Sequence, residues 1–147
     1  MADKTLLPAG DIKSIAKALL DWLRTCQDMP SDLKLAYQNL DNDSGMSLHT
    51  LRGTVKRTEY VDGGYEGYYP FAIYLRDVPD STNTRLQCSS ILDTIGSWID
   101  EQRVYPDITD DISVSEINWV ANATLVKRFE SGIEDYMATF ELIFEKE

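Results

Sequence analysis

Histidine, cysteine and positive charge are all scarce in this sequence. It has one histidine, two cysteines and 14 lysine and arginine residues against 25 aspartate and glutamate residues, so the formal net charge is −11. A structural zinc site usually takes four thiolate or imidazole ligands, whereas Cys26, Cys88 and His49 supply only three. A nucleic-acid-binding surface needs a basic stripe, and here the lysines and arginines are scattered. The composition argues against both kinds of site and favours a protein partner.

Long apolar runs are missing as well. Residues 1–10 contain no run long enough for a signal peptide, and no later window approaches the length of a transmembrane span. Cys26 and Cys88 fall on the apolar faces of predicted helices, where free thiols behave as small hydrophobic groups. We therefore expect a protein made in the cytoplasm without membrane association, with reduced cysteines and with residues 1–10 as a flexible tail.

Two amphipathic helices are predicted. After Asp11, which we interpret as an N-cap, apolar residues recur every three or four positions, and Met29-Pro30 ends the run. A second helix is capped by Asp80 or Ser81. Its apolar positions are Leu86, Cys88, Ile91, Leu92, Ile95, Trp98 and Ile99. Each helix has one apolar stripe, as expected for helices that lie on one face of a sheet.

Alternation of apolar and polar residues predicts the strands. The runs are residues 33–40, 51–61, 69–75, 112–129 with an irregularity at 121–123, and 133–144. The second and third runs flank a glycine-rich turn and predict an antiparallel hairpin. The sequence thus predicts one α+β domain over residues 1–147. It has a mainly antiparallel sheet of about four to five strands with two helices packed on one face.

Two groups of residues are candidates for an assembly interface. If the helices cover one face of the sheet, Tyr74, Met137, Thr139 and Ile143 lie on the other, semi-apolar face. The glycine-rich turn is expected to carry Tyr65 and Tyr68 on a flexible loop. Each group has a simpler alternative, namely an ordinary exposed sheet face, or tyrosine rings that fold back onto the sheet.

Motifs for catalysis and for ion binding are absent or incomplete. His49 lies near Ser47 without a Gly-x-Ser-x-Gly elbow, and a solvent-facing strand histidine is the favoured interpretation. The turn at residues 41–45 lacks the ligand spacing of a calcium loop, and residues 63–67 lack the Lys-Ser/Thr pair of a phosphate loop. Asp110 and Asp111 alone are a weak magnesium signal. We predict no catalytic residue, no cofactor and no metal.

Four segments together resemble small tail-completion or tail terminator proteins of long-tailed bacteriophages and prophages, which are often labelled minor capsid proteins. The segments are residues 19–23 (LLDWL), 69–74 (YPFAIY), 92–99 (LDTIGSWI) and 136–142 (YMATFEL), within a resemblance that covers roughly residues 11–146. The resemblance implies a non-enzymatic virion protein, made in the cytoplasm of a bacterial host. It would cap the tail tube and join it to the head, as a monomer in solution or as a six-fold ring.

The implied partners are the tail tube protein and head–tail connector proteins, with no sequence-specific nucleic acid. In this interpretation the exposed sheet face or the Tyr65–Tyr68 hairpin tip contacts a neighbouring subunit. The acidic connection, with Asp107, Asp110 and Asp111, lines a rim or lumen that repels DNA phosphates. Three alternatives stay open: a head-side minor capsid or head–tail joining protein, an acidic inhibitor that binds a basic protein, and a small hydrolase with a carboxylate of raised pKa.

Overall fold

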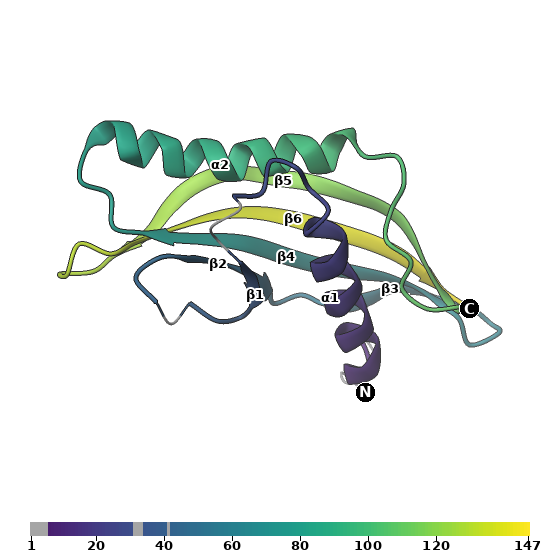
Figure 1. Cartoon of the computed structure of the whole chain (residues 1–147). Helices are drawn as coiled ribbons and strands as arrows, with labels where there is room; N and C mark the ends of the chain where they lie inside the picture. The colour runs from purple at the N-terminus through teal and green to yellow at the C-terminus, as the bar shows by residue number, and fades with distance from the viewer. Residues whose placement is uncertain (1–5, 31–33, 41) are drawn as a thin grey trace.

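The computed structural model of the chain describes residues 6–30, 34–40 and 42–147, which form two helices and a six-stranded sheet (Figure 1). The helices are α1 (Ala9–Leu23) and α2 (Thr82–Glu101). The strands are β1 (Leu35–Tyr37), β2 (Gly45–Thr50), β3 (Val55–Glu59), β4 (Tyr65–Asp77), β5 (Ile112–Arg128) and β6 (Glu134–Lys146). The sheet order is β1-β2-β4-β6-β5, and β3 pairs with the start of β4. Of these pairings, only β1 with β2 is parallel.

The predicted α+β class, the mainly antiparallel sheet and the two helices on one face are confirmed. The sheet has more strands than predicted because the chain between residues 45 and 59 forms two strands instead of one. Gly53 adopts a φ of 99° between them, a conformation that L-residues with a side chain rarely adopt. As a result, β2 and β3 pair with consecutive parts of β4, residues 71–76 and 65–68.

The helix starts differ in how well the sequence predicted them. Ser81 caps α2 as expected, since its hydroxyl accepts the amide N–H of Thr84 at 3.2 Å. The N-cap of α1 is Pro8, so the prediction of Asp11 as the cap was wrong. Asp11 lies in the first helical turn, where the positive end of the helix dipole stabilises a carboxylate. The predicted flexible tail covered residues 1–10, and α1 includes its last two residues, Ala9 and Gly10. Residues 1–5 of that tail lie outside the described residues.

The core lies between the sheet and the two helices. Alternate side chains of β4 and β6 face the helices, and the rings of Phe71 and Phe140 stack there with centroids 5.3 Å apart. In Figure 1, α2 runs alongside part of β5 and β6, and α1 crosses in front of β4. Trp22 of α1 contacts Trp98 of α2 at 4.9 Å between ring centroids, which joins the two helices over this face.

Candidate functional site: assembly surfaces

The sheet face opposite the helices, here called the uncovered face, is the first candidate surface. Tyr74 pairs with Met137 across β4 and β6, and Ala72 pairs with Thr139 in the next row of the same face. Met137 and Thr139 are half-buried rather than covered by a helix. Beside these rows lies Glu141, whose carboxylate accepts the side-chain amide of Asn118 at 2.9 Å. The face is therefore semi-apolar, as the alternation in the sequence predicted, with an uncharged patch at Tyr74, Met137 and Thr139.

Charged groups border this face at one end. The guanidinium of Arg76 binds the carboxylate of Asp135 in a two-bonded geometry, at 2.7 and 2.9 Å. Such a bidentate pair is among the stronger ion pairs because both bonds are charge-assisted. At the other end Glu66 pairs with Glu145 across the strands. A partner that fits this face would contact the uncharged patch of Tyr74, Met137 and Thr139, with the Arg76–Asp135 pair on one side of it and Glu141 on the other.

The predicted interface residues are not equally accessible. Tyr68 is half-buried, and its ring lies beneath the guanidinium of Arg57 at 5.7 Å. Its cross-strand partner Ile143 is only 7% exposed. Of the predicted set on this face, Tyr68, Tyr74, Met137 and Thr139 can reach a partner without rearrangement of the strands, whereas Ile143 cannot.

The prediction that Tyr65 and Tyr68 lie on a flexible loop was wrong. Both belong to β4, and the turn of the hairpin is shorter, at residues 60–64. Tyr65 is 3% exposed on the helix face, where its hydroxyl donates to the carboxylate of Asp11. Lys146 donates to the other oxygen of Asp11 at 2.7 Å. Tyr65 therefore holds α1 on the sheet instead of facing a neighbour.

His49 lies against the uncovered face, with its ring centroid 4.4 Å from that of Tyr74. Its Nε2 atom is buried and has no hydrogen-bond partner among the described residues. Burial lowers the pKa of His49, so the imidazole is neutral at pH 7. His49 is half-exposed in β2 on the face that no helix covers, so the interpretation of a solvent-facing strand histidine holds in part, although Nε2 is buried. The hydroxyl of nearby Ser47 accepts the amide N–H of Asn39 at 2.9 Å.

The acidic connection between α2 and β5 is exposed, with Asp107, Asp110 and Asp111 all facing solvent. The Thr109 hydroxyl donates a hydrogen bond to Asp111 at 2.6 Å. This hydrogen bond is the main reason why the pKa of the Asp111 carboxyl is lowered. Lys146 approaches Asp111 at 3.8 Å. These contacts keep Asp111 ionised, and the proposed role of the three residues as an acidic rim stays a prediction.

The outer edge of β5 is protected by α2. The amides of Trp119 and Ala123 donate to the carboxylates of Asp100 and Asp93, at 3.2 and 2.9 Å. The indole N–H of Trp119 donates to the carbonyl of Ala121 at 3.0 Å. An exposed strand edge can pair with another chain, and occupied amide and carbonyl groups prevent this. The middle of β5 is therefore unsuited to strand addition.

Reactive groups are few in the described part of the chain. Burial, together with nearby Asp77, raises the pKa of Cys88 to about 11, and burial also raises the pKa of Cys26. Both thiols are therefore protonated at pH 7 and are poor nucleophiles. Among the described residues no group of His, Cys, Asp and Glu has a geometry that could hold a metal ion. Nor is any described helix both long and apolar enough for a membrane span.

Among the carboxylates of the described residues, Glu134 is the most fully buried, at 1% exposure. Tyr136, Arg128 and Arg85 donate to it at 2.6, 2.7 and 3.1 Å. Burial alone would raise its pKa, but these hydrogen bonds outweigh burial and hold the pKa below the ordinary value of 4.5. The cluster joins α2, β5 and β6, so it is a structural element of the fold.

The Glu134 cluster predicts a pH dependence of stability. Because the folded-state pKa is below 4.5, the stabilisation is complete above that pH and is lost as pH falls through the folded-state value. We expect Glu134→Gln to lower the free energy of unfolding at pH 7 by about 1.5 kcal/mol, the value of a hydrogen bond to a charged group. Urea unfolding of both proteins from pH 7 to pH 3 should show this difference shrinking below pH 4.5. A difference that is constant over the range would contradict the assignment.

Comparison with known proteins identifies a fold relative. No protein-family model matches the chain, and no curated protein matches it. Among solved structures, a chain described as belonging to the virion of a native gene transfer agent particle has a similar fold, with a TM-score of 0.61. The alignment covers 89% of this chain and 97% of that chain at 9% sequence identity. At this identity the similarity shows a shared fold over nearly the full length of both chains.

Proposed function

We propose that this chain is a non-enzymatic structural protein of a phage-like virion, made in the cytoplasm of a bacterial host. Its role would be that of a tail terminator, which caps the tail tube as a ring and joins it to the head. The observation that carries the proposal is the shared fold with a virion chain, which spans 97% of that chain and leaves little of either protein unmatched.

The surface chemistry supports an assembly role. The uncovered sheet face offers an uncharged patch at Tyr74, Met137 and Thr139, next to Glu141, of a kind that protein interfaces bury. The cysteines are protonated, and the buried carboxylate Glu134 has a lowered rather than a raised pKa. A general acid with a raised pKa, as a hydrolase would use, is not provided by this group.

The test is binding to the tail tube protein encoded at the same locus. We expect a defined complex with assembled tubes, seen by electron microscopy as a ring at one tube end, and tubes that stop growing when the protein is added. If the protein does not bind the tube but binds portal-side connector proteins, the terminator role is overturned and the head-side alternative is supported. A protein that binds neither would overturn the virion role.

Charge introduced on the uncovered face should weaken tube binding. In Met137→Lys/Thr139→Lys, two ammonium groups would have to be desolvated at the contact, so we expect binding to weaken at least tenfold. The matched control is Leu86→Lys, because Leu86 is 62% exposed on α2, away from this face. Sedimentation with preformed tubes measures both variants, and circular dichroism checks their folding. Equal binding by both variants would exclude this face as the tube contact.

A further inference from the structure

An apolar groove lies between α1 and β1, on the helix side of the molecule. Ile12, Ala16 and Leu20 of α1 line it together with Tyr37 of β1, around a cavity of 440 Å³. Lys13 and Lys17 also line it, and both side chains are exposed. Within the described chain no ion pair engages either lysine. In a protein of net charge −11, these two lysines make the lining of an apolar groove basic.

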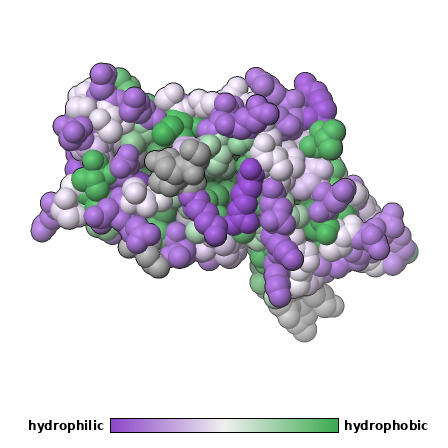
Figure 2. Space-filling view, viewed as in Figure 1, coloured by the Kyte–Doolittle hydropathy of each residue, from purple (hydrophilic) through white to green (hydrophobic). Residues whose placement is uncertain are grey.

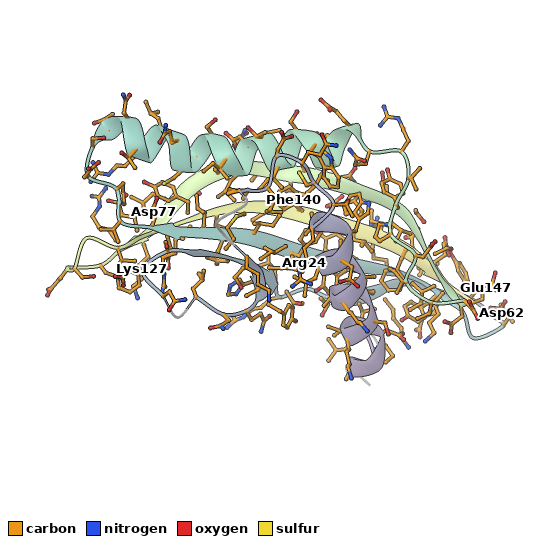
Figure 3. All side chains as sticks on the ribbon, viewed as in Figure 1. Arg24, Asp62, Asp77, Lys127, Phe140 and Glu147 are labelled. Carbon is orange, nitrogen blue, oxygen red and sulfur yellow. The ribbon has the colours of Figure 1, made fainter. Side chains whose placement is uncertain are left out.

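The β3–β4 turn has the opposite properties. Val61 at its tip is exposed to 109% of the reference value, so its side chain touches almost nothing of its own chain. The turn and the segments beside it carry five carboxylates, those of Glu59, Asp62, Glu66, Glu145 and Glu147, and Figure 3 shows Asp62 and Glu147 together at the right-hand end of the molecule. Two of them already have basic partners in β3, since Lys56 pairs with Glu59 and Arg57 with Glu66, each at 3.7 Å. Hydrophilic residues crowd the same end in Figure 2.

The turn is held in one shape before any contact is made. The Tyr60 amide donates to the Gly64 carbonyl at 2.8 Å, and the Gly64 amide donates to the Asp62 carboxylate at 3.0 Å. Gly63 adopts a φ of 94°, which suits a tight turn. The Tyr60 hydroxyl donates to Glu145 at 2.9 Å and ties the turn to β6. A fixed turn loses little conformational entropy on binding, and preorganised loops bind more tightly for that reason.

We propose that the β3–β4 turn of one subunit inserts into the α1–β1 groove of a second copy of this chain. Val61 would fill the apolar floor between Ile12 and Leu20, while the acidic turn would face Lys13 and Lys17. In Figure 1, α1 lies between β1 and the hairpin turn, so the groove and the turn are on opposite sides of α1. A contact between two different patches is heterologous, and its repetition forms a ring when the rotation closes.

The inference rests on the proposed function, since it assigns the subunit contact of the proposed ring. The residues of this contact differ from those of the predicted one. The hairpin takes part through its turn at residues 60–64, and not through Tyr65, which is buried beneath α1. The uncovered sheet face is then left for the tail tube.

A charge exchange tests the contact. In Lys13→Glu/Lys17→Glu the groove becomes acidic, and in Glu59→Lys/Glu147→Lys the turn gains two cations. Each variant alone should self-associate at least tenfold more weakly than the natural sequence. Lys13→Glu/Lys17→Glu sets an acidic groove against the acidic turn, and Glu59→Lys/Glu147→Lys brings two ammonium groups to the lysines of the groove. An equimolar mixture should recover assembly, since each turn then meets a groove of opposite charge. Sedimentation velocity, with and without tail tubes, measures all four samples.

The apolar part of the contact has its own test. Val61→Ser should weaken self-association about tenfold or more, because it removes one buried aliphatic side chain. Val104→Ser is the matched control, since Val104 is 79% exposed and lies outside both the groove and the turn. Equal assembly by Val61→Ser and the natural sequence would overturn the proposed contact.

The outcomes separate the contact from the function. Recovery in the mixture, with weak assembly of each variant alone, supports the turn-in-groove contact. Variants that all assemble as rings on tail tubes would overturn this contact while the tail terminator role stands. A natural chain that forms neither rings nor tube complexes at any concentration would overturn both.

Discussion

Replacing Phe140 with alanine is expected to lower the free energy of unfolding by about 3–5 kcal/mol, the usual cost of removing a buried aromatic ring. Phe140 is 1% exposed, its ring stacks on Phe71, and Trp119 stands opposite it on β5. Figure 3 places it between α2 and the sheet. Because a domain of this size is stable by only about 5–15 kcal/mol, the variant should unfold at much lower urea concentration.

The control for Phe140→Ala lies three residues away on the other face of β6. Met137→Ala removes a side chain of comparable length from the uncovered face, where it is half-buried. We expect a loss of about 1 kcal/mol or less. Equilibrium urea unfolding, followed by circular dichroism, measures both. Similar losses for the two variants would mean that both faces of the sheet are packed in the isolated chain, and the proposed tube contact would lose its basis.

The alternation in β6 explains why much of the fold was predictable. Side chains of period two must point to opposite faces, so Phe140 and Met137 could be separated without a structure. The same logic placed Tyr74 and Thr139 together on the uncovered face. The single helical stripe of α2 was equally clear, although Leu86, which was assigned to it, is 62% exposed beyond the edge of the core.

The errors came from features that depend on tertiary contacts. Tyr65 follows two glycines, and nothing local shows that β4 begins at Tyr65 and that Asp11, 54 positions earlier, accepts its hydroxyl. Ile143 alternates like the half-buried residues Met137 and Thr139, and its burial depends on the register that sets it opposite Tyr68. The α1–β1 groove likewise needs two segments brought together by the fold. Such contacts carry no periodic signal in the sequence.

The protection of the outer edge of β5 depends on the close approach of α2 to Trp119. A Cβ atom added at Gly96 of α2 would lie 2.4 Å from the indole ring of Trp119, far inside contact distance. The ring cannot move freely, since its N–H is bonded to the Ala121 carbonyl. Gly96 therefore lets α2 lie close enough for Asp93 and Asp100 to reach the outer amides of β5.

Gly96→Ala is accordingly expected to destabilise the protein by about 2–3 kcal/mol, the cost of overpacking, even though alanine favours helices by about 1 kcal/mol. Gly10→Ala in α1 is the matched control, because a Cβ at Gly10 meets nothing within 4 Å, and it should stabilise by about 0.5 kcal/mol. Urea unfolding gives both values, and the Trp119 environment can be followed by fluorescence. If α2 is displaced, the freed β5 edge should also raise aggregation, which light scattering detects. A Gly96→Ala protein as stable and as soluble as Gly10→Ala would show that the edge is protected without this contact.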